Sequence, residues 1–515
     1  MSKTVFGLYL GNSSASIGIC RDGKVDILAN EAGDRVTPAV VTFSDTEEVV
    51  GAAAKSRLIS QAKNTIIKNK RALNTELTET DLETIMRETK VDIDTSNDTI
   101  QYRVSYQDSS KVKTIDPIQV TTVLLKTIYG IAKSAIHTEE DTISCVLLTP
   151  VYFNHDSRKN LRKAAQDAGW NILHVINEPC AALLGYNINT AAPEHNVKVL
   201  VYRCGGISCD VTIVDIQHGL MSIVDSVHST EIGGEKIVKK LMGHLQEEIQ
   251  RKYKLDIADS HRSMAKLRAA AETCMHVLSA LQSSDIFIES LYDGLDFKYN
   301  VSRGRFDSLI GGLLGSFVQP IEDLLARANV KNDQINKVLL VGGPLKIPKF
   351  QSYIKSLFPL AECPGTTSIN PDEILAAGAA RQAGFLVDML VDFDKHLPEP
   401  NTDVIVIGDD ISVEVVDMQV DQLKFSSNLP LPCVQKLSLG TLDSTSLHIV
   451  ASQSSATAGV MLKGKVAFEN LTSGLVVTLS VHVTIDNKLN VELWDNSTPS
   501  HLIQSHALEL VEVSA

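Results

Sequence analysis

Two small-residue loops in this sequence could hold the phosphates of a nucleotide. The segment VYRCGGISCDV, residues 201–211, reads as an apolar strand, a Gly-Gly turn followed by Ser208, and a second strand that opens with Asp210. Backbone N–H groups in such a turn can converge on an anion. Arg203 stands where such a loop would be expected to have an acid that holds a metal ion. The loop could therefore be a working ATPase loop, an altered one, or no nucleotide loop at all.

The same plan of strand, loop and strand occurs twice, about 195 residues apart. Residues 4–30 give a strand, a small-residue loop, a strand, a turn at Asp22-Gly23 and a third strand. Residues 198–226 repeat this order, with a turn at His218-Gly219. Asp-Gly between alternating apolar residues is a strong hairpin signal. The repetition predicts two similar lobes that face each other.

Helices and buried strands are expected to position these loops. Asp116-Pro117 gives a helix cap followed by apolar residues at helical spacing. Residues 144–150 and 336–343 are continuously apolar, as in strands covered on both faces, and a polar helix is expected at 155–169. Residues 391–403 are acidic and contain prolines, which is typical of a linker. Residues 404–515 predict a small all-β domain, so the class is α/β followed by all-β.

Composition narrows the function classes. The chain has 515 residues, 44% of them apolar and 21% charged, which predicts a folded protein of two or three domains. A net charge of -14 disfavours a broad nucleic-acid surface. The N-terminus lacks the plan of a secretory signal, and no stretch reaches the roughly 18 to 20 apolar residues of a membrane span. The eight cysteines form no CxxC pair, and Cys204 and Cys209 are expected to be buried and reduced, as in a cytosolic protein.

Ordered strings along the chain resemble the seventy-kilodalton heat-shock chaperone (Hsp70) family. The strings are GLYLGNSSA (7–15), NEAGDRVTPAVVTF (30–43), TPVYFN (149–154), VINEPCAALLGY (175–186), VYRCGGISCDV (201–211), LLVGGPLKIPKFQ (339–351) and INPDEILAAGAA (369–380). They span nearly all of residues 4–390. The resemblance implies that residues 1–390 form an actin-like nucleotide-binding domain, a duplicated ribonuclease H-like fold with two lobes.

The resemblance also implies which residues bind ATP. Remnants of the family's catalytic group stand at Lys70, Glu178 and Asp210. No metal ligand is expected. The nucleotide contacts implied by matching positions are Gly11, Asn12, Ser13, Lys70, Arg203, Gly205, Gly206, Ser208, Gly233, Gly234, Glu272, His276, Ser279, Gly342, Gly343, Lys346 and Asp372.

The two loops depart from the family pattern where hydrolysis needs acids. Tyr9 and Arg203 stand at positions where the family has aspartates that hold the water shell of magnesium or polarise the attacking water. Losing one such electrostatic group costs about 10²- to 10³-fold in rate. We therefore expect ATP binding, without required Mg²⁺, and little or no hydrolysis. An equally weighted alternative is that Arg203 forms a salt bridge with an acid across the cleft. Ile207 replaces a glycine, which would cost about 1 to 2 kcal/mol if the position needs positive φ.

The adenosine side departs too. Met275 and His276 replace a lysine and an arginine of the family, and Lys346 replaces the arginine that stacks on adenine. A lysine keeps the charge but loses planar stacking, so weak to moderate ATP affinity is expected. Taken alone, His276 is more often a surface or core histidine, and Gly342-Gly343 could simply be a turn after a buried strand.

The C-terminal strands resemble a shortened form of the family's peptide-binding β domain without its helical lid. Together with the altered loops, this resembles an atypical member that forms a heterodimer with a zuotin-like J-domain co-chaperone in the ribosome-associated complex. That implies a cytosolic protein that reaches the ribosome through its partner and helps a conventional Hsp70 on nascent polypeptides, with no direct nucleic-acid or membrane contact. One alternative is an ATP-hydrolysing foldase that binds unfolded polypeptide directly. Another, an actin-like or sugar-kinase relative, is disfavoured by the β domain.

Overall fold

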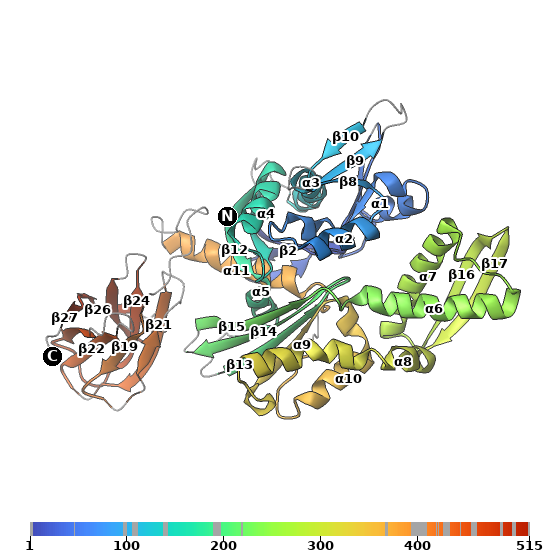
Figure 1. The fold of residues 1–515 in the computed structure, drawn as a ribbon. Coiled ribbons are helices and arrows are strands. Elements are labelled where there is room, and N and C mark those ends of the chain that lie inside the picture. The colour runs from blue at the N-terminus through green and yellow to red at the C-terminus, as the bar shows by residue number, and fades with distance from the viewer. Residues whose placement is uncertain are drawn as a thin grey trace. The chain divides into compact units, whose positions relative to one another are not determined.

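The structure is a computed structural model, and it divides the chain into two compact units. The first comprises residues 1–191, 197–214 and 223–400, and the second comprises 401–515 with the short segments 192–196 and 215–222. The described residues are 4–45, 47–95, 100–105, 112–136, 143–188, 197–217, 220–365, 369–392, 409–418, 420, 422–425, 433–442, 444–454, 461–484, 488–496 and 501–512. Figure 1 shows the elements in chain order by colour.

The first sheet of the first unit carries the N-terminal loop. Its strands run in the order β12 (Trp170–Asn177), β11 (Ile143–Thr149), β1 (Val5–Leu10), β2 (Ser14–Arg21) and β3 (Lys24–Ile27), and β4 (Thr37–Pro38) pairs with β2. β1 is parallel to β11 and antiparallel to β2. Asp22 and Gly23, at the predicted hairpin turn, both have positive φ, as a tight hairpin requires.

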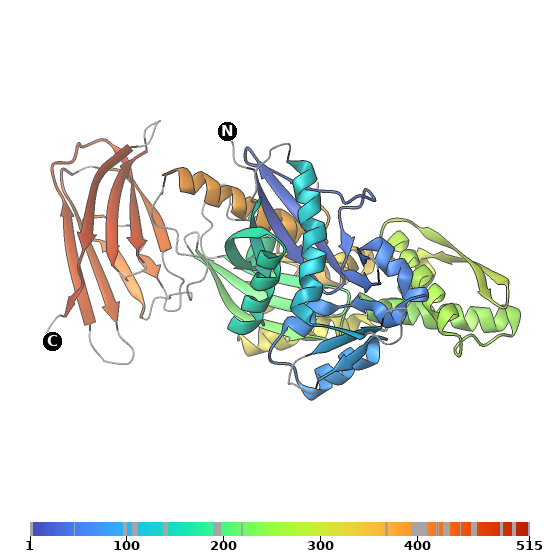
Figure 2. The same ribbon diagram turned by 90° about the horizontal axis from the view of Figure 1, so that it is seen from above.

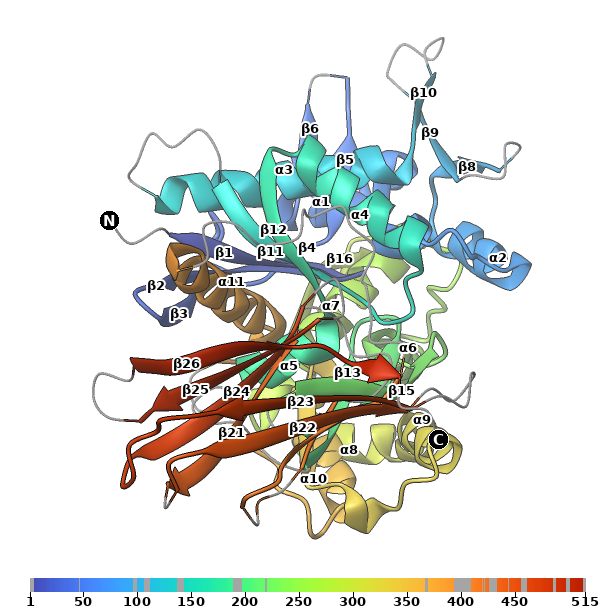
Figure 3. The same ribbon diagram turned by 90° about the vertical axis from the view of Figure 1, so that its left-hand side faces the viewer.

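Helices cover both faces of this sheet. Figure 3 shows α3 (Pro117–Ala135) and α4 (His155–Asp167) on one face and α11 (Ile374–Asp392) on the other. The Asp116 side chain caps α3 by accepting from Gln119 N at 2.7 Å, as the sequence predicts. α11 packs closely because Gly7 has no side chain: a Cβ there would lie 2.0 Å from Ala380 N.

The second sheet repeats the plan of the first and carries the second loop. Its order is β15 (Leu220–Ser229), β14 (Cys209–Gln217), β13 (Val197–Cys204) and β18 (Lys337–Val341), with β13 parallel to β18. The predicted turn at residues 218–219 lies outside the described residues. Two sheets of matching order, each starting from a strand and loop with a parallel neighbour, confirm the duplicated actin-like fold class.

Smaller elements surround each sheet. Beside the first sheet lie β5 (Val40–Phe43), β6 (Glu48–Val50), β7 (Thr65–Ile67), α1 (Ala52–Ser56), α2 (Glu79–Glu88), β8 (Asp92–Asp94), β9 (Gln101–Ser105), β10 (Val112–Ile115) and the 3₁₀ turns η1 (Arg57–Ile59), η2 (Ala62–Asn64) and η3 (Asn69–Leu73). The second lobe adds α5 (Glu178–Gly185), which joins the lobes, and α6 (Gly234–Tyr253), α7 (His261–Ala280), β16 (Ser283–Tyr292), β17 (Leu295–Ser302), α8 (Arg303–Gly311), α9 (Leu314–Arg327), η4 (Asn332–Gln334), η5 (Gly343–Lys346) and α10 (Pro348–Leu357). In Figure 2 the yellow-green hairpin β16–β17 runs beside α7.

In the described residues, every regular element of the second unit after residue 400 is a strand. One sheet has the order β20 (Leu423–Phe425), β19 (Ile411–Val415), β22 (Leu447–Ser454), β23 (Met461–Phe468) and β27 (Val511–Glu512). The other has the order β21 (Cys433–Thr441), β24 (Val476–Val483), β25 (Leu489–Asp495) and β26 (His501–Leu508). The two sheets share one hydrophobic core. The expected all-β character of this region is confirmed.

The boundary between the two predicted domains stays a prediction. α11 continues to Asp392, and residues 393–408, which hold most of the expected linker at 391–403, lie outside the described residues. Among the described helices, none is by itself long and apolar enough to cross a membrane.

Candidate functional site

The two loops close in the same way in the two lobes. Gly11 N donates to Ser14 O at 2.7 Å, and Gly205 N donates to Ser208 O at 2.9 Å. The first loop is tied to η3, because Arg71 N donates to Asn12 Oδ1 at 2.8 Å. Each loop is therefore a short, hydrogen-bonded turn at the end of a central strand.

The second loop packs against the first loop and the start of α6. A Cβ on Gly206 would lie 2.1 Å from Ser13 Oγ, and a Cβ on Gly233 would lie 2.6 Å from Gly206 O. Gly234 N donates to Gly205 O at 3.0 Å. Only glycines fit at these close approaches. The backbone cradle that results, beside the N-terminus of a 20-residue helix, suits an anionic phosphate chain.

Ile207 does not have the strained backbone that the sequence suggested. It is absent from the described non-glycine residues with positive φ, so the anticipated cost for a β-branched residue does not arise. Ser208 is 3% exposed and its backbone carbonyl closes the turn.

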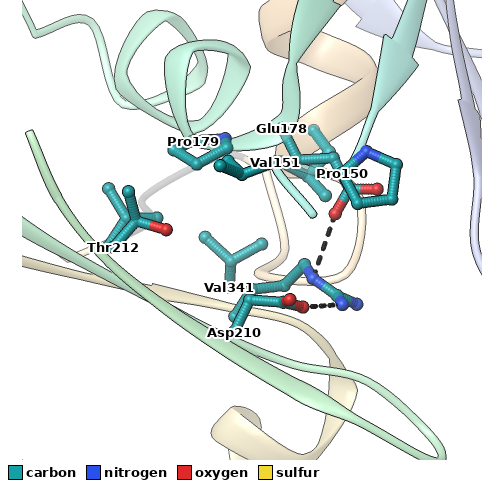
Figure 4. A pocket seen from close by; sticks show the side chains of 10 residues that line it. Pro150, Val151, Glu178, Pro179, Asp210, Thr212 and Val341 are labelled. Carbon is teal, nitrogen blue, oxygen red and sulfur yellow. Dashed lines mark hydrogen bonds and ion pairs between the residues drawn. The ribbon is translucent and has the colours of Figure 1, made fainter. Parts of the chain in front are cut away.

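A buried ionic cluster lies beside the loops. It joins Arg203 at the end of β13, Glu178 at the start of α5 and Lys70 in η3: Lys70 Nζ lies 2.5 Å from Glu178 Oε1, and Arg203 Nε lies 3.0 Å from Glu178 Oε2. Arg203 also pairs with Asp210, whose Oδ1 lies 2.7 Å from His228 Nδ1. Figure 4 shows Glu178 and Asp210 with the two Arg203 ion pairs as dashed lines. Arg203 thus bridges an acid of α5, the helix that joins the lobes, and an acid of β14.

Burial makes this cluster tightly coupled. Glu178 and Lys70 are each 3% exposed. Burial raises the pKa of Glu178, but the nearby Lys70 and Arg203 outweigh it and hold the pKa below its usual value. Glu178 therefore stays ionised and engaged by two cations. Burial, together with the negative charge of Glu178, raises the pKa of Tyr9 to about 12. Its phenol therefore stays protonated at neutral pH.

The cluster also has an apolar side. A small pocket of about 10 Å³ adjoins Glu178, Arg203 and Asp210, and its other walls are Pro150, Val151, Pro179, Val201, Thr212, Val341 and Leu375 (Figure 4). His228 stacks on Tyr152 with ring centroids 3.8 Å apart. Burial lowers the pKa of His228 to about 4, and Arg203 adds to this effect, so the ring is neutral at pH 7.

The donor set fits a phosphate chain better than a divalent metal with its water shell. A metal of that kind prefers carboxylates that are free to point at it. Here both remaining acids, Glu178 and Asp210, already pair with cations of the protein. In the described part of the chain, no group of three or more His, Cys, Asp and Glu side chains has the arrangement of a metal site.

The residues expected on the adenosine side form two ion pairs. Lys55 Nζ lies 2.7 Å from Glu272 Oε1, and Lys346 Nζ lies 2.7 Å from Asp372 Oδ2. Burial lowers the pKa of His276, and the charges of both ion pairs act on it as well. Ser279 Oγ donates to the His276 carbonyl at 2.6 Å, within α7. The structure brings these residues together from α7, η5 and the segment before α11.

Gly342 and Gly343 differ from each other. Gly342 has φ of +106°, and a Cβ there would lie 2.0 Å from Cys204 O, so the turn after β18 requires glycine. A Cβ on Gly343 would meet no atom within 4 Å. Gly342 therefore has the structural role that the sequence allowed, a turn after a buried strand. Contact of Gly342 and Gly343 with a ligand stays a prediction.

Sequence reasoning missed a second ionic cluster between the lobes. Lys68, at φ of +58°, pairs with Glu88 at 2.9 Å and with Glu235 in the first turn of α6. Arg268 pairs with the same Glu235 at 2.7 Å, and Arg71 pairs with Glu88 at 2.9 Å. No local signal marks these contacts, because Lys68 and Glu235 are far apart in the sequence.

Comparison with known proteins finds one matching family model and several similar proteins. A family model described as "Hsp70 protein" matches residues 5–414. The chain is 36% identical to Heat shock 70 kDa protein 14 of Danio rerio, over 87% of this chain and 88% of that protein. It is 34% identical to Heat shock 70 kDa protein 14-B of Xenopus laevis, over 94% and 96%. It is 33% identical to Heat shock 70 kDa protein 14 of Homo sapiens, over 96% and 97%.

Proposed function

The chain belongs to the Hsp70 family, whose ATPase domain implies nucleotide binding, and we propose that it is a co-chaperone scaffold that binds ATP with little or no hydrolysis. The observation that carries the proposal is the Arg203–Glu178–Lys70 cluster beside the two loops. The acids beside the loops, Glu178 and Asp210, are already paired with Lys70 and Arg203. Hydrolysis would need acids at this place that are not paired, so that they could act on magnesium or water.

Each part of the cluster argues against fast hydrolysis. Tyr9, with a pKa of about 12, cannot accept a proton from water at neutral pH. Arg203 is a cation, and Glu178 is held between it and Lys70. Each missing electrostatic group costs about 10²- to 10³-fold in rate. With two acids replaced, turnover falls far below that of an enzyme that has both.

Binding is supported by the loops. Ser13, Gly205, Gly206, Gly233 and Gly234 would hold the phosphates, and Glu272, His276, Lys346 and Asp372 would face the nucleoside. Bound ATP would supply a polyanion. For ATP to bind without Mg²⁺, the guanidinium of Arg203 or the ammonium of Lys70 would exchange its acid partner for the phosphates.

Two measurements on the purified chain test this proposal. Equilibrium binding of ATP is expected with Mg²⁺ and also with a chelator, and single-turnover hydrolysis of radiolabelled ATP is expected to be barely above the uncatalysed rate. Glu178→Gln is the control for contaminating ATPase, because a contaminant's activity would not change with it. Turnover that requires Mg²⁺ and disappears in Glu178→Gln would instead support the ATP-hydrolysing foldase that binds unfolded polypeptide.

The partners belong to the same proposal. We infer a heterodimer with a zuotin-like J-domain co-chaperone in a cytosolic ribosome-associated complex, which helps a conventional Hsp70 on nascent polypeptides. The resemblance of the altered loops and the lidless β domain to an atypical family member motivates this inference. The net charge of -14 is compatible with it, because an acidic chain could sit on a ribosome if a basic partner supplied the RNA contacts.

Affinity purification from cytosol at low salt tests the assembly. The J-domain protein and ribosomes are expected to copurify, and depletion of the J-domain protein is expected to remove the ribosomes but leave the chain soluble. Recovery of a clean monomer without ribosomes would overturn the scaffold proposal.

A further inference from the structure

Two thiols face each other across the second loop. Cys204 is the last residue of β13 and Cys209 is the first residue of β14, and both are fully buried. Gly205 N donates to Ser208 O at 2.9 Å, so Gly205 and Ser208 form the closing pair of the hairpin. In the matching first loop, where Gly11 N donates to Ser14 O, the next pair outward is Leu10 opposite Ala15. By the same register, Cys204 lies opposite Cys209.

This position suits a disulfide. The closing pair of the hairpin is hydrogen-bonded, so the next pair is of the non-hydrogen-bonded kind, in which Cα atoms are about 4.5 Å apart and side chains are closest. Disulfides span Cα separations of about 4.4 to 6.8 Å. Both cysteines belong to the same hydrophobic core cluster, so their side chains point to the same face of the hairpin. Both are free thiols in the structure.

We propose that Cys204 and Cys209 are a redox-modifiable pair, which hydrogen peroxide converts to an intramolecular disulfide across the second loop. The thiolate of one cysteine attacks the peroxide oxygen, forms a sulfenic acid and releases hydroxide. The thiolate of the other then attacks the sulfenic sulfur, forms the S–S bond and expels a second hydroxide. The two thiol protons combine with the two hydroxides to give two water molecules. The two electrons that reduce the peroxide come from the two sulfurs.

Burial controls when this reaction occurs. Burial raises the pKa of Cys204 well above its usual value and that of Cys209 to about 11, and thiols of that kind are inert. Oxidation therefore requires the loop to open and expose the sulfurs. The rate is set by loop opening, and once formed the disulfide closes a short ring around Gly205–Ser208 that restrains further opening. The inference does not depend on whether the loop binds a nucleotide.

Peptide mapping of the full chain tests the proposal. The reduced protein is treated with hydrogen peroxide, alkylated in denaturant and cut with trypsin, which places both thiols in one peptide, residues 204–236. We expect this peptide to lose both alkylation sites together, to be lighter by two hydrogens than its reduced form, and to recover both sites after dithiothreitol. Amide exchange at Gly206 and Ile207 is expected to slow at least several-fold after oxidation.

Variants separate this pair from general thiol oxidation. Cys204→Ala and Cys209→Ala should each abolish the two-hydrogen loss, whereas Cys274→Ala, which removes another buried thiol, should leave it unchanged. Should an alanine variant fail to fold, the wild-type peptide map still decides. The proposal would be overturned if the two thiols were oxidised independently, or if either formed a bond with another cysteine. It would also be overturned if the peptide remained fully alkylated after the more exposed cysteines had been oxidised.

Discussion

Arg203 carries two ion pairs, to Glu178 and to Asp210, on a side chain that is 9% exposed. Removing one partner of a buried charge pair leaves the others uncompensated and costs about 3 to 5 kcal/mol. We expect Arg203→Ala to lower the free energy of unfolding of the first unit by about that amount, measured by urea unfolding. Arg203→Lys should lower the free energy of unfolding less, because lysine keeps the positive charge. It can form a good ion pair with only one of the two acids.

A double-mutant cycle decides whether the loss comes from this cluster. Glu178→Gln should lower the free energy of unfolding less in the Arg203→Ala background than in the wild type. In that background the Glu178 carboxylate has already lost its Arg203 partner. Equal and additive costs would mean that Arg203 acts through packing instead of charge.

His228 gives the cluster a pH dependence. Burial lowers its folded-state pKa to about 4, against 6.5 in the unfolded chain, with Arg203 and Lys70 adding to the shift and Glu178 and Asp81 opposing it. Between these values the unfolded chain binds the extra proton, so stability is full above pH 6.5 and falls as the pH drops toward 4. The loss should reach about 2 to 3 kcal/mol. Urea unfolding at a series of pH values should show this slope in the wild type and a shallower one in His228→Asn.

At the residue scale, sequence reasoning located the chemistry but not its state. It identified Lys70, Glu178 and Asp210, and it weighed an Arg203 salt bridge across the cleft against phosphate contact; the structure contains that salt bridge. It could not show that Glu178 is engaged on both oxygens, since this depends on atoms from η3 and β13 meeting in space. The cost that Ile207 would carry at positive φ does not arise, because the loop closes through Gly205 and Ser208 without positive φ between them.

At the scale of elements, the Lys68 cluster joins η3 and α2 of one lobe to α6 and α7 of the other. Lys68 is 7% exposed and pairs with Glu88 and Glu235. We expect Lys68→Asn, which tolerates the left-handed backbone but removes the charge, to raise the rate of lobe opening roughly 10- to 100-fold. Hydrogen exchange in η3 and in the first turn of α6 measures this. Lys163→Asn is the matched control, because the Lys163–Asp167 pair lies exposed within α4; equal exchange in both variants would contradict a clamp.

The packing of α11 on β1 makes a second prediction at this scale. A Cβ on Gly7 would lie 2.0 Å from Ala380 N, so Gly7→Ala must push the helix away from the sheet. Overpacking of this kind costs about 1 to 3 kcal/mol. Gly130→Ala in α3, where a Cβ meets nothing within 4 Å, should instead stabilise by about 0.5 to 1 kcal/mol. Thermal unfolding of the two variants should shift in opposite directions.

Elements with local signals were predictable, and contacts between them were not. The cap at Asp116, the hairpin turn at Asp22 and the apolar strands at 143–149 and 337–341 all appear where the sequence indicates. The Lys68–Glu235 contact and the glycine that admits α11 depend on residues far apart in the chain. Periodicity and turn chemistry carry no information about such pairs.

At the scale of the whole molecule, duplication was the decisive sequence feature. Two loops with the same plan predicted two sheets of the same order, and the fold has them. The change to turn-separated strands after residue 404 likewise predicted the β character of the second unit. The end of the first domain was not settled in the same way, because the expected linker is largely outside the described residues.

The chain has one tryptophan in each unit, Trp170 in β12 and Trp494 in β25, so each unit can report its own unfolding. Trp494→Phe leaves Trp170 to report the first unit, and Trp170→Phe leaves Trp494 to report the second. A ligand that binds only the folded first unit stabilises that unit by about 2.7 kcal/mol at 100 times its dissociation constant. We expect saturating ATP to raise the unfolding midpoint reported by Trp170 and to leave the one reported by Trp494 unchanged. Because Arg203 and Lys70 can exchange their acid partners for the phosphates, a chelator should preserve the shift. Loss of the shift with chelator would show that binding needs a divalent metal, and an equal shift at both tryptophans would show that the two units do not respond separately.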